Sequence, residues 1–320
     1  MVPRPAIVDP LIRSLASVTC IVALLPIGMG ALVTTLKAGM AFADWPSSDG
    51  QNMLLYPWFR DFFDHPDKFV EHGHRLAGVL IGLVSICLAI AGWVAGSKTT
   101  RIFVTAILIS VIAQGLLGGA RVLMDRQIMA MIHSITGASF FALCIVFRLL
   151  CSDRRMQWSN IADTKLTPFS AAVVACLPVV VIGQYVLGGM LRHLHLMLNE
   201  HIVGAIVTGF AACSAIVVLL RTDHPLLKLC GLLISASLFA QISLGIGAYI
   251  TRFGLASVGY VATAGSVAQS IVCSLHTVVG MFLLSSSVVS TVSLAMLYRA
   301  GMLKGLNVEF MPLADRGSAV

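Results

Sequence analysis

The chain has 320 residues, of which 58% are hydrophobic and only 11% are charged. Soluble domains are about a quarter charged, so this composition excludes an ordinary soluble protein and a disordered one. The mean hydropathy of +0.93 indicates more apolar surface than a globular core can bury. We therefore expect an integral membrane protein, and the distribution of the formal net charge of +7 must decide whether nucleic acid is a partner.

Helices that cross a membrane need about 20 mostly apolar residues. The first candidate follows a short basic N-terminus, but its apolar core is too long for a signal peptide and no small-residue cleavage site follows it, so we expect a retained helix. Eight stretches qualify in chain order: roughly 14–36, 69–95, 102–123, 128–150, 168–191, 196–220, 227–249 and 268–298. The sequence thus predicts an all-α, polytopic membrane protein with both termini on one side.

The basic residues indicate which side. If the N-terminus is cytoplasmic, 13 lysines and arginines lie in inner segments and seven in outer segments or at outer helix ends, with Arg75 inside a span. The positive-inside rule favours this orientation. The inner set is Arg4, Arg13, Lys98, Arg101, Arg148, Arg154, Arg155, Lys165, Arg221, Lys228, Arg299, Lys304 and Arg316. The net charge is therefore interpreted as a topology signal, and we expect no nucleic acid partner.

The eight cysteines all fall in spans or at the cytoplasmic border, where oxidation to disulfides is not favoured. We therefore interpret them as small packing residues.

An internal repeat organises the chain. His74 and His201 are 127 residues apart, and so are Gln114 and Gln241, which both begin a Gln-x-x-Leu-Gly motif. The tripeptides at 26–28 and 181–183 match at an offset of 155, which leaves about 28 extra residues in the first outer loop. We predict two parallel, pseudo-symmetric four-helix bundles, 1–155 and 156–320. The Gly-Gly pairs of these motifs also have a simpler interpretation, close helix packing.

Four of the nine histidines lie within the predicted spans, five to eight residues past the outer helix end: His74, His133, His201 and His276. At 1.5 Å per residue they share a depth of roughly 7–12 Å. A lone membrane histidine is most often a packing residue, but four at one depth on alternate helices favour a functional site. A small residue follows each one at i+3 or i+4, which would open that face to a flat macrocycle. Two histidines in each half favour an iron porphyrin over zinc, which takes four converging ligands.

The two halves differ beside their histidines. Glu71 lies three residues before His74, on the same helix face, whereas the equivalent residue before His201 is Leu198. A carboxylate at this depth is costly unless it is paired or protonated. Two roles stay open for Glu71, an ion pair with Arg75 and a catalytic role, and both can hold together.

With these motifs the chain resembles the haem A synthases, bacterial and mitochondrial membrane enzymes that convert haem O to haem A. The resemblance covers most of the chain and rests on Glu71-x-x-His74-Arg75, on Gln114–Gly119 and Gln184–Gly189, on the remaining histidines, and on the loop 37–46. It implies a substrate site for haem O in the N-terminal half, between His74 and His133 with Glu71 near the reacting methyl group. It also implies a haem B in the C-terminal half. Many family members carry cysteine pairs in outer loops, and this chain has none there.

The same resemblance implies that His201 and His276 are the axial ligands of that haem B, and that all four histidines bind iron. It also implies that a methyl group is oxidised to a formyl group by successive hydroxylations, in haem A biosynthesis for terminal oxidases. An external electron donor and haem O synthase are the expected protein partners, besides the lipid bilayer.

Arginines near the outer helix ends are candidates to bind the haem propionates, because guanidinium groups match carboxylates. Contact with lipid headgroups is at least as good an interpretation of each. The candidates are Arg121, Arg126, Arg192 and Arg252. Trp45, Tyr56 and Trp58 in the first outer loop could cover a porphyrin, but the interfacial aromatic belt is the favoured interpretation.

Two other functions remain open at this point. A di-haem electron-transfer protein would need the four histidines but not a glutamate in one half only. A transporter is compatible with parallel repeats, but it gives no reason for four histidines at equal depth.

Overall fold

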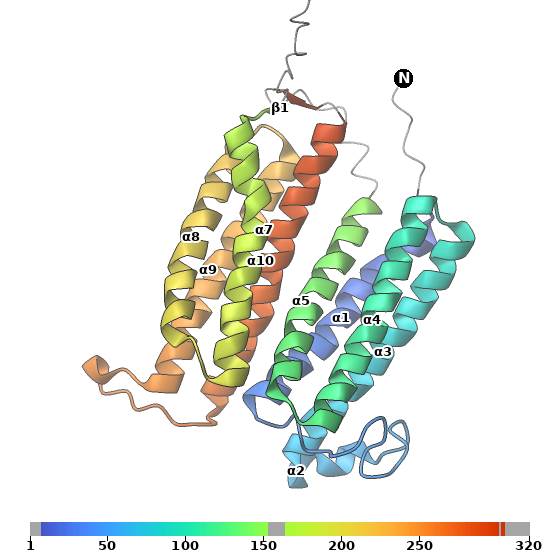
Figure 1. The fold of residues 1–320 in the computed structure, drawn as a ribbon, viewed down its shortest axis with the longest axis vertical. Helices are drawn as coiled ribbons and strands as arrows, with labels where there is room; N and C mark the ends of the chain where they lie inside the picture. The colour runs from blue at the N-terminus through green and yellow to red at the C-terminus, as the bar shows by residue number, and fades with distance from the viewer. Residues whose placement is uncertain (1–7, 153–163, 301, 305–320) are drawn as a thin grey trace, which may run out of the picture.

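The computed structural model describes residues 8–152, 164–300 and 302–304. In this part of the chain, eight helices are long and apolar enough to cross a membrane (Figure 1). They are α1 (Pro10–Thr35), α3 (Pro66–Ala95), α4 (Lys98–Met124), α5 (Gln127–Leu150), α7 (Pro168–Gly189), α8 (Leu198–Leu220), α9 (Pro225–Phe253) and α10 (Val267–Arg299). The predicted spans are confirmed, with ends that differ by a few residues, and the protein is a multi-pass membrane protein.

Helix starts follow local chemistry. Proline, which lacks an N–H and has a helical φ, stands at the first position of α1, α3, α7 and α9. Side-chain oxygens of Ser97, Thr167 and Ser266 accept hydrogen bonds from the first turns of α4, α7 and α10. These residues lie in the polar segments between hydrophobic runs, which is why hydropathy located the spans so closely.

Short elements fill the connections. The loop after α1 contains η1 (Trp58–Arg60) and α2 (Asp61–Asp64), and α7 ends in a π-helical turn, η2 (Met190–Leu194). The loop before α10 contains η3 (Ala256–Val258). A two-residue parallel pair joins β1 (Thr164–Lys165) to β2 (Leu303–Lys304). The predicted domain boundary at 155/156 and four of the inner basic residues (Arg4, Arg154, Arg155 and Arg316) lie outside the described residues.

The helices form two groups of four that lie side by side, α1, α3, α4 and α5 in one and α7 to α10 in the other (Figure 1). In the first group α1 contacts α3, α3 contacts α4, α4 contacts α5, and α5 contacts α1. The second group repeats this closed ring as α7, α8, α9 and α10. The arrangement in two four-helix bundles agrees with the prediction, while the exact symmetry between them stays a prediction.

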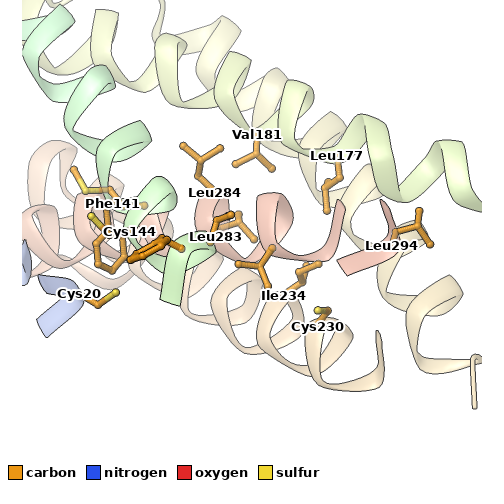
Figure 2. Packing of buried hydrophobic residues seen from close by; sticks show 14 of the residues in the cluster. Cys20, Phe141, Cys144, Leu177, Val181, Cys230, Ile234, Leu283, Leu284 and Leu294 are labelled. Carbon is orange, nitrogen blue, oxygen red and sulfur yellow. The ribbon is translucent and has the colours of Figure 1, made fainter. Parts of the chain in front are cut away.

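The bundles meet along a seam formed by α1 and α5 on one side and by α7, η2 and α10 on the other. Figure 2 shows part of the buried core there, where Phe141 and Cys144 of α5 lie near Cys20 of α1. Phe141 also meets Phe282 of α10 edge to face, at 5.3 Å between ring centroids. One continuous hydrophobic cluster therefore includes residues of both bundles. All eight cysteines are free thiols.

Candidate functional site

The four histidines of the spans form two facing pairs, one in each bundle. The rings of His74 and His133 have centroids 6.1 Å apart and are nearly perpendicular, at 85°. Those of His201 and His276 have centroids 6.3 Å apart, at 87°. The structure therefore brings together the residues that the sequence singled out, and it pairs them within the halves.

The spacing of each pair leaves room for one metal atom between the rings. An imidazole nitrogen binds a metal such as zinc at about 2.0–2.1 Å, so two rings on opposite sides of a metal have centroids about 6–7 Å apart. Within the described part of the chain, no three His, Cys, Asp or Glu side chains gather as a metal-ligand cluster. Two opposed imidazoles without further ligands are the donor set of a porphyrin iron, which brings four nitrogens of its own.

The C-terminal pair opens on a cavity of about 550 Å³ between α7, α8, α9 and α10. Its volume is in the range of cofactor sites, which are mostly apolar with a few polar groups. Its apolar walls include Ala205, Leu238 and Ile242. Arg192 and Arg252 line the cavity together with the two histidines. Leu198, the predicted apolar counterpart of Glu71, also lines this cavity.

Each histidine also contacts a polar group on the preceding membrane helix. His74 Nδ1 lies 3.0 Å from the carbonyl oxygen of Pro26. The other three lie against glutamine amides: Gln184 is 3.1 Å from His201 Nδ1, and Gln241 is 3.4 Å from His276 Nε2. In the amide orientation that satisfies its neighbours, Gln114 Nε2 lies 3.0 Å from His133 Nδ1. From the sequence, these glutamines stand out only as parts of repeated and family motifs, with no contact to a histidine predicted.

The small residues that follow the histidines have more than the predicted role. Gly280 and Ala205 do line the C-terminal cavity. However, a Cβ added at Gly280 would lie 3.3 Å from Gln241, and one at Gly137 would lie 3.5 Å from Gln114. Gly280 therefore also makes room for Gln241, whereas the contact at Gly137 would be an ordinary van der Waals contact.

Glu71 is buried and forms the ion pair that the sequence left open. Its Oε1 lies 2.7 Å from Arg75 Nη2. Its Oε2 accepts hydrogen bonds from the backbone N–H groups of Ala41, at 2.7 Å, and Phe42, at 3.3 Å. The carboxylate thus anchors the loop after α1 to α3. A catalytic role of Glu71 stays a proposal in addition to this structural role.

Arg75 holds the same loop from the other side of the ion pair. Its Nη1 donates to the carbonyl oxygens of Asp44, at 3.0 Å, and Ser47, at 2.7 Å. Arg121 of α4 donates to the carbonyl oxygen of Gly39. Charged groups that bind backbone atoms in this way fix the loop above the N-terminal histidine pair.

Aromatic side chains complete this attachment. Trp58 stacks on Phe69 of α3, with ring centroids 4.7 Å apart, and its indole N–H donates to the Phe69 carbonyl at 2.7 Å. Trp45 packs on Gly119 of α4, where a Cβ would collide with the indole ring. The structure places these tryptophans against protein, and the extra length of the loop is ordered by these contacts.

His72 was given no role from the sequence, and it is fully buried under this loop. Its Nδ1 lies 3.1 Å from Ser48 Oγ, and its ring contacts Phe42 and Tyr56. Only its place within the Glu71–Arg75 segment could have suggested this. His72 therefore belongs to the attachment of the loop.

The candidate propionate-binding arginines fall in different places. Arg252 is exposed at the rim of the C-terminal cavity, whereas Arg121 lies in the other bundle. Arg192 lines the cavity, yet it donates to Ala31 O (2.6 Å), Thr35 Oγ1 (2.8 Å) and Thr277 Oγ1 (2.6 Å). Arg192 thus joins α1 of one bundle to α10 of the other, a role that the sequence did not indicate.

Fold and site together define a multi-pass helical membrane protein with two facing imidazole pairs, one of them in a cofactor-sized cavity. Residues 62–201 match the COX15-CtaA family model, described as "Cytochrome oxidase assembly protein". This match includes Glu71, His74, His133 and His201. The similarity to the haem A synthase family that the motifs predicted is confirmed over this segment.

Curated proteins that are similar to parts of this chain are named "Heme A synthase". "Heme A synthase" of Shouchella clausii (strain KSM-K16) is 29% identical over 151 residues, which are 46% of this chain and 48% of that protein. "Heme A synthase" of Brucella ovis is 31% identical over 129 residues, which are 38% of this chain and 35% of that protein. The alignments thus span about half and about a third of the length of these relatives.

Proposed function

We propose that this protein is a haem A synthase, which oxidises a methyl group of haem O to a formyl group by successive hydroxylations. The observation that carries the proposal is an asymmetry. Two facing histidine pairs repeat in two bundles, but among the residues that the structure describes only the N-terminal pair has a buried carboxylate and an anchored loop beside it. An enzyme with one resident haem and one substrate haem needs such a difference, whereas a di-haem electron carrier does not.

In this proposal the N-terminal bundle, within residues 1–155, receives haem O between His74 and His133. The C-terminal bundle, within residues 156–320, holds haem B between His201 and His276. The apolar cavity beside the second pair supports that assignment, because a resident cofactor is held best by a preformed pocket. Haem B held there would supply one-electron redox chemistry.

The protein's own residues bind, orient and shield. The histidine pairs fix the plane and depth of each porphyrin, and the loop held by Glu71 and Arg75 excludes water from the substrate side. Glu71 acts as a negative charge, and as a proton acceptor when its ion pair opens, near the reacting methyl group. Arg121 in the N-terminal half, and Arg192 and Arg252 in the C-terminal half, are the proposed partners of anionic propionates.

The remaining proposals concern the surroundings. The protein lies in the inner membrane of a bacterium with both termini in the cytoplasm, as the positive-inside rule favours. It receives electrons from an external donor and haem O from haem O synthase, and it delivers haem A for terminal oxidases.

The test compares the haems of cells that make haem O, with and without this protein, after extraction and chromatographic separation. Haem A is expected only where the protein is present, and the purified protein is expected to carry low-spin haem B. Two bound haems of unchanged type and no haem A would favour a di-haem electron-transfer protein. No bound haem after haem-replete expression would overturn both.

A further inference from the structure

Every membrane histidine of the two pairs lies against a glycine of the preceding membrane helix. A Cβ added to that glycine would approach the imidazole Cε1 to 3.0 Å at His74, 3.5 Å at His133, and 3.1 Å at His201 and His276. The four glycines are Gly30, Gly118, Gly188 and Gly245. Contacts of 3.0–3.1 Å are closer than ordinary van der Waals distance, so at three of the four sites alanine would press on the ring.

Four residues before each glycine, on the same helix face, stands the residue whose polar atom meets the histidine. These residues are Pro26, through its carbonyl oxygen, and Gln114, Gln184 and Gln241, through their side chains. We call each such pair of residues, one polar group and the glycine one turn later, a histidine seat.

We propose that the Gln-x-x-Leu-Gly motifs are histidine seats, in which the glutamines are positioning residues for the proposed haem ligands and the glycines admit the rings. The inference rests on the proposed function, because it assumes that the histidines bind haem. Its physical basis is general: a ligand histidine donates its second N–H to an acceptor, which fixes the orientation of the ring and tunes its basicity. The amide nitrogens face the rings in this structure, so the proposal includes that each amide turns its oxygen to the ring when the histidine binds haem.

Other glycines of the same helices show that close helix packing is a different role from contact with a histidine ring. A Cβ added at Gly115 or Gly183 would meet nothing within 4 Å. Close approach of helices therefore does not explain all glycines of these segments. The seat glycines are distinguished by the imidazole that lies against each one.

One seat differs from the other three. His74 meets a backbone carbonyl, whereas the other three histidines meet glutamine side chains. In the proposed function His74 contacts the substrate haem, which must leave after each reaction. His74 therefore differs from the three others in that its seat contacts the ring through a backbone carbonyl and not through a side chain.

The test uses purified full-length protein and measures haem B binding, the low-spin electron paramagnetic resonance spectrum and the reduction potential of the C-terminal haem. Gln184→Leu is expected to weaken haem B binding about 10- to 100-fold and to shift the spectrum and potential. Gln184→Glu, which keeps a hydrogen-bonding side chain of the same length, is expected to recover most of the binding. Gly188→Ala is expected to change the spectrum, and Gly183→Ala, one turn earlier on the same helix, is expected to leave it unchanged.

Wild-type spectra and potential in both Gln184→Leu and Gly188→Ala would overturn the seat proposal while leaving the proposed function intact. Equal damage from Gly188→Ala and Gly183→Ala would also overturn it, in favour of helix packing. If the wild-type protein binds no haem, the proposed function itself fails. Gln114→Leu gives the matched comparison in the other bundle, where a loss of haem A with an unchanged haem B spectrum is expected.

Discussion

The two histidine pairs have nearly the same internal geometry but very different outer ends. Above the N-terminal pair, the long connection from α1 to α3 is fastened by Glu71, Arg75 and Arg121. Beside the C-terminal pair, the connection from η2 to α8 is short, and the rings open on an apolar cavity. The helical frame thus places the rings alike in both bundles, and the two bundles differ in the connections beside the rings.

The same contrast holds one turn outside the histidines. Glu71 precedes His74 by three residues and is buried in an ion pair, while Leu198 precedes His201 by three and lines the cavity. A buried charge is costly unless it is paired, so a protein that only needed two equivalent haems gains nothing from it in one half. Substitutions in each bundle test whether this difference has functional consequences.

The largest effects are expected from the histidines themselves. His276→Ala removes one of the two rings beside the C-terminal cavity, and we expect loss of the low-spin haem B. His74→Ala should abolish haem A formation but leave that haem B in place, because its pair lies in the other bundle. Absorption spectra of the purified variants and chromatography of extracted haems measure both results. His65→Ala, an exposed histidine at the start of α3, is the control, and haem B loss in His74→Ala would contradict the division between bundles.

Glu71→Gln is expected to lower haem A production about 100-fold, the scale of a lost proton-handling group, with haem B unchanged. The amide keeps an acceptor for the loop N–H groups but removes the charge that pairs with Arg75. We expect haem O or a hydroxylated product to accumulate in the extracted haems.

Glu200→Gln provides the matched control, because Glu200 is an exposed carboxylate next to His201. Limited proteolysis of the loop 37–60 in both variants separates chemistry from loop attachment. Normal haem A production by Glu71→Gln would remove Glu71 from the mechanism and leave it the anchoring role alone.

Arg192→Lys tests whether the two bundles depend on each other. An ammonium group cannot copy the two-pronged contact with α1 and α10, and the loss of one charged hydrogen bond costs about 2 kcal/mol. We expect the thermal midpoint to fall by roughly 4–8 °C, with both haem sites weakened together. Arg221→Lys, at the exposed end of α8, is the control. Damage confined to the C-terminal haem would instead indicate a propionate-binding role for Arg192.

Much of this contrast could be predicted from the sequence, because its parts are local. Hydropathy located the spans, and helical spacing placed Glu71 beside His74 and Leu198 beside His201. The depth of the four histidines followed from helix starts and rise per residue. Their pairing within each bundle then required that four sequential helices close into a ring, which places alternate helices opposite one another.

The rest depends on contacts between residues far apart in the chain. Nothing in the sequence near Arg192 indicates that Ala31 and Thr35 accept its hydrogen bonds. The match of the first and fifth predicted helices rested on a tripeptide at an offset of 155, whereas the equivalent glycines, Gly30 and Gly188, are 158 residues apart. The two offsets differ by three residues, so the register between these two helices stays a prediction.

The smallest expected effect comes from the turn at the tip of the first outer loop. Asp44 Oδ1 accepts a hydrogen bond from the N–H of Asp49, at 3.0 Å, and Oδ2 accepts one from Gly50, at 2.8 Å. Burial acts to raise the pKa of Asp44, but these bonds and one from Ser47 lower it below its ordinary value of 3.8. A carboxyl with a lowered folded pKa stabilises the turn above its unfolded pKa, and this contribution is lost as the pH falls through the folded pKa.

We therefore expect the loop of the wild-type protein to keep its resistance to proteolysis down to pH 5 and to lose part of it below pH 3.8. Asp44→Asn, which offers one acceptor for two N–H groups, should lose that part at neutral pH and lower haem A production by a factor of about two to five. An acid-stable protease at several pH values measures the first effect, and haem chromatography measures the second. Asp64→Asn, an exposed carboxyl of the same loop, is the control. An unchanged pH profile in Asp44→Asn would mean that Asp44 does not stabilise the loop. The contrast between the two bundles would then depend on the other contacts of the loop, those of Glu71, Arg75, Arg121 and the tryptophans.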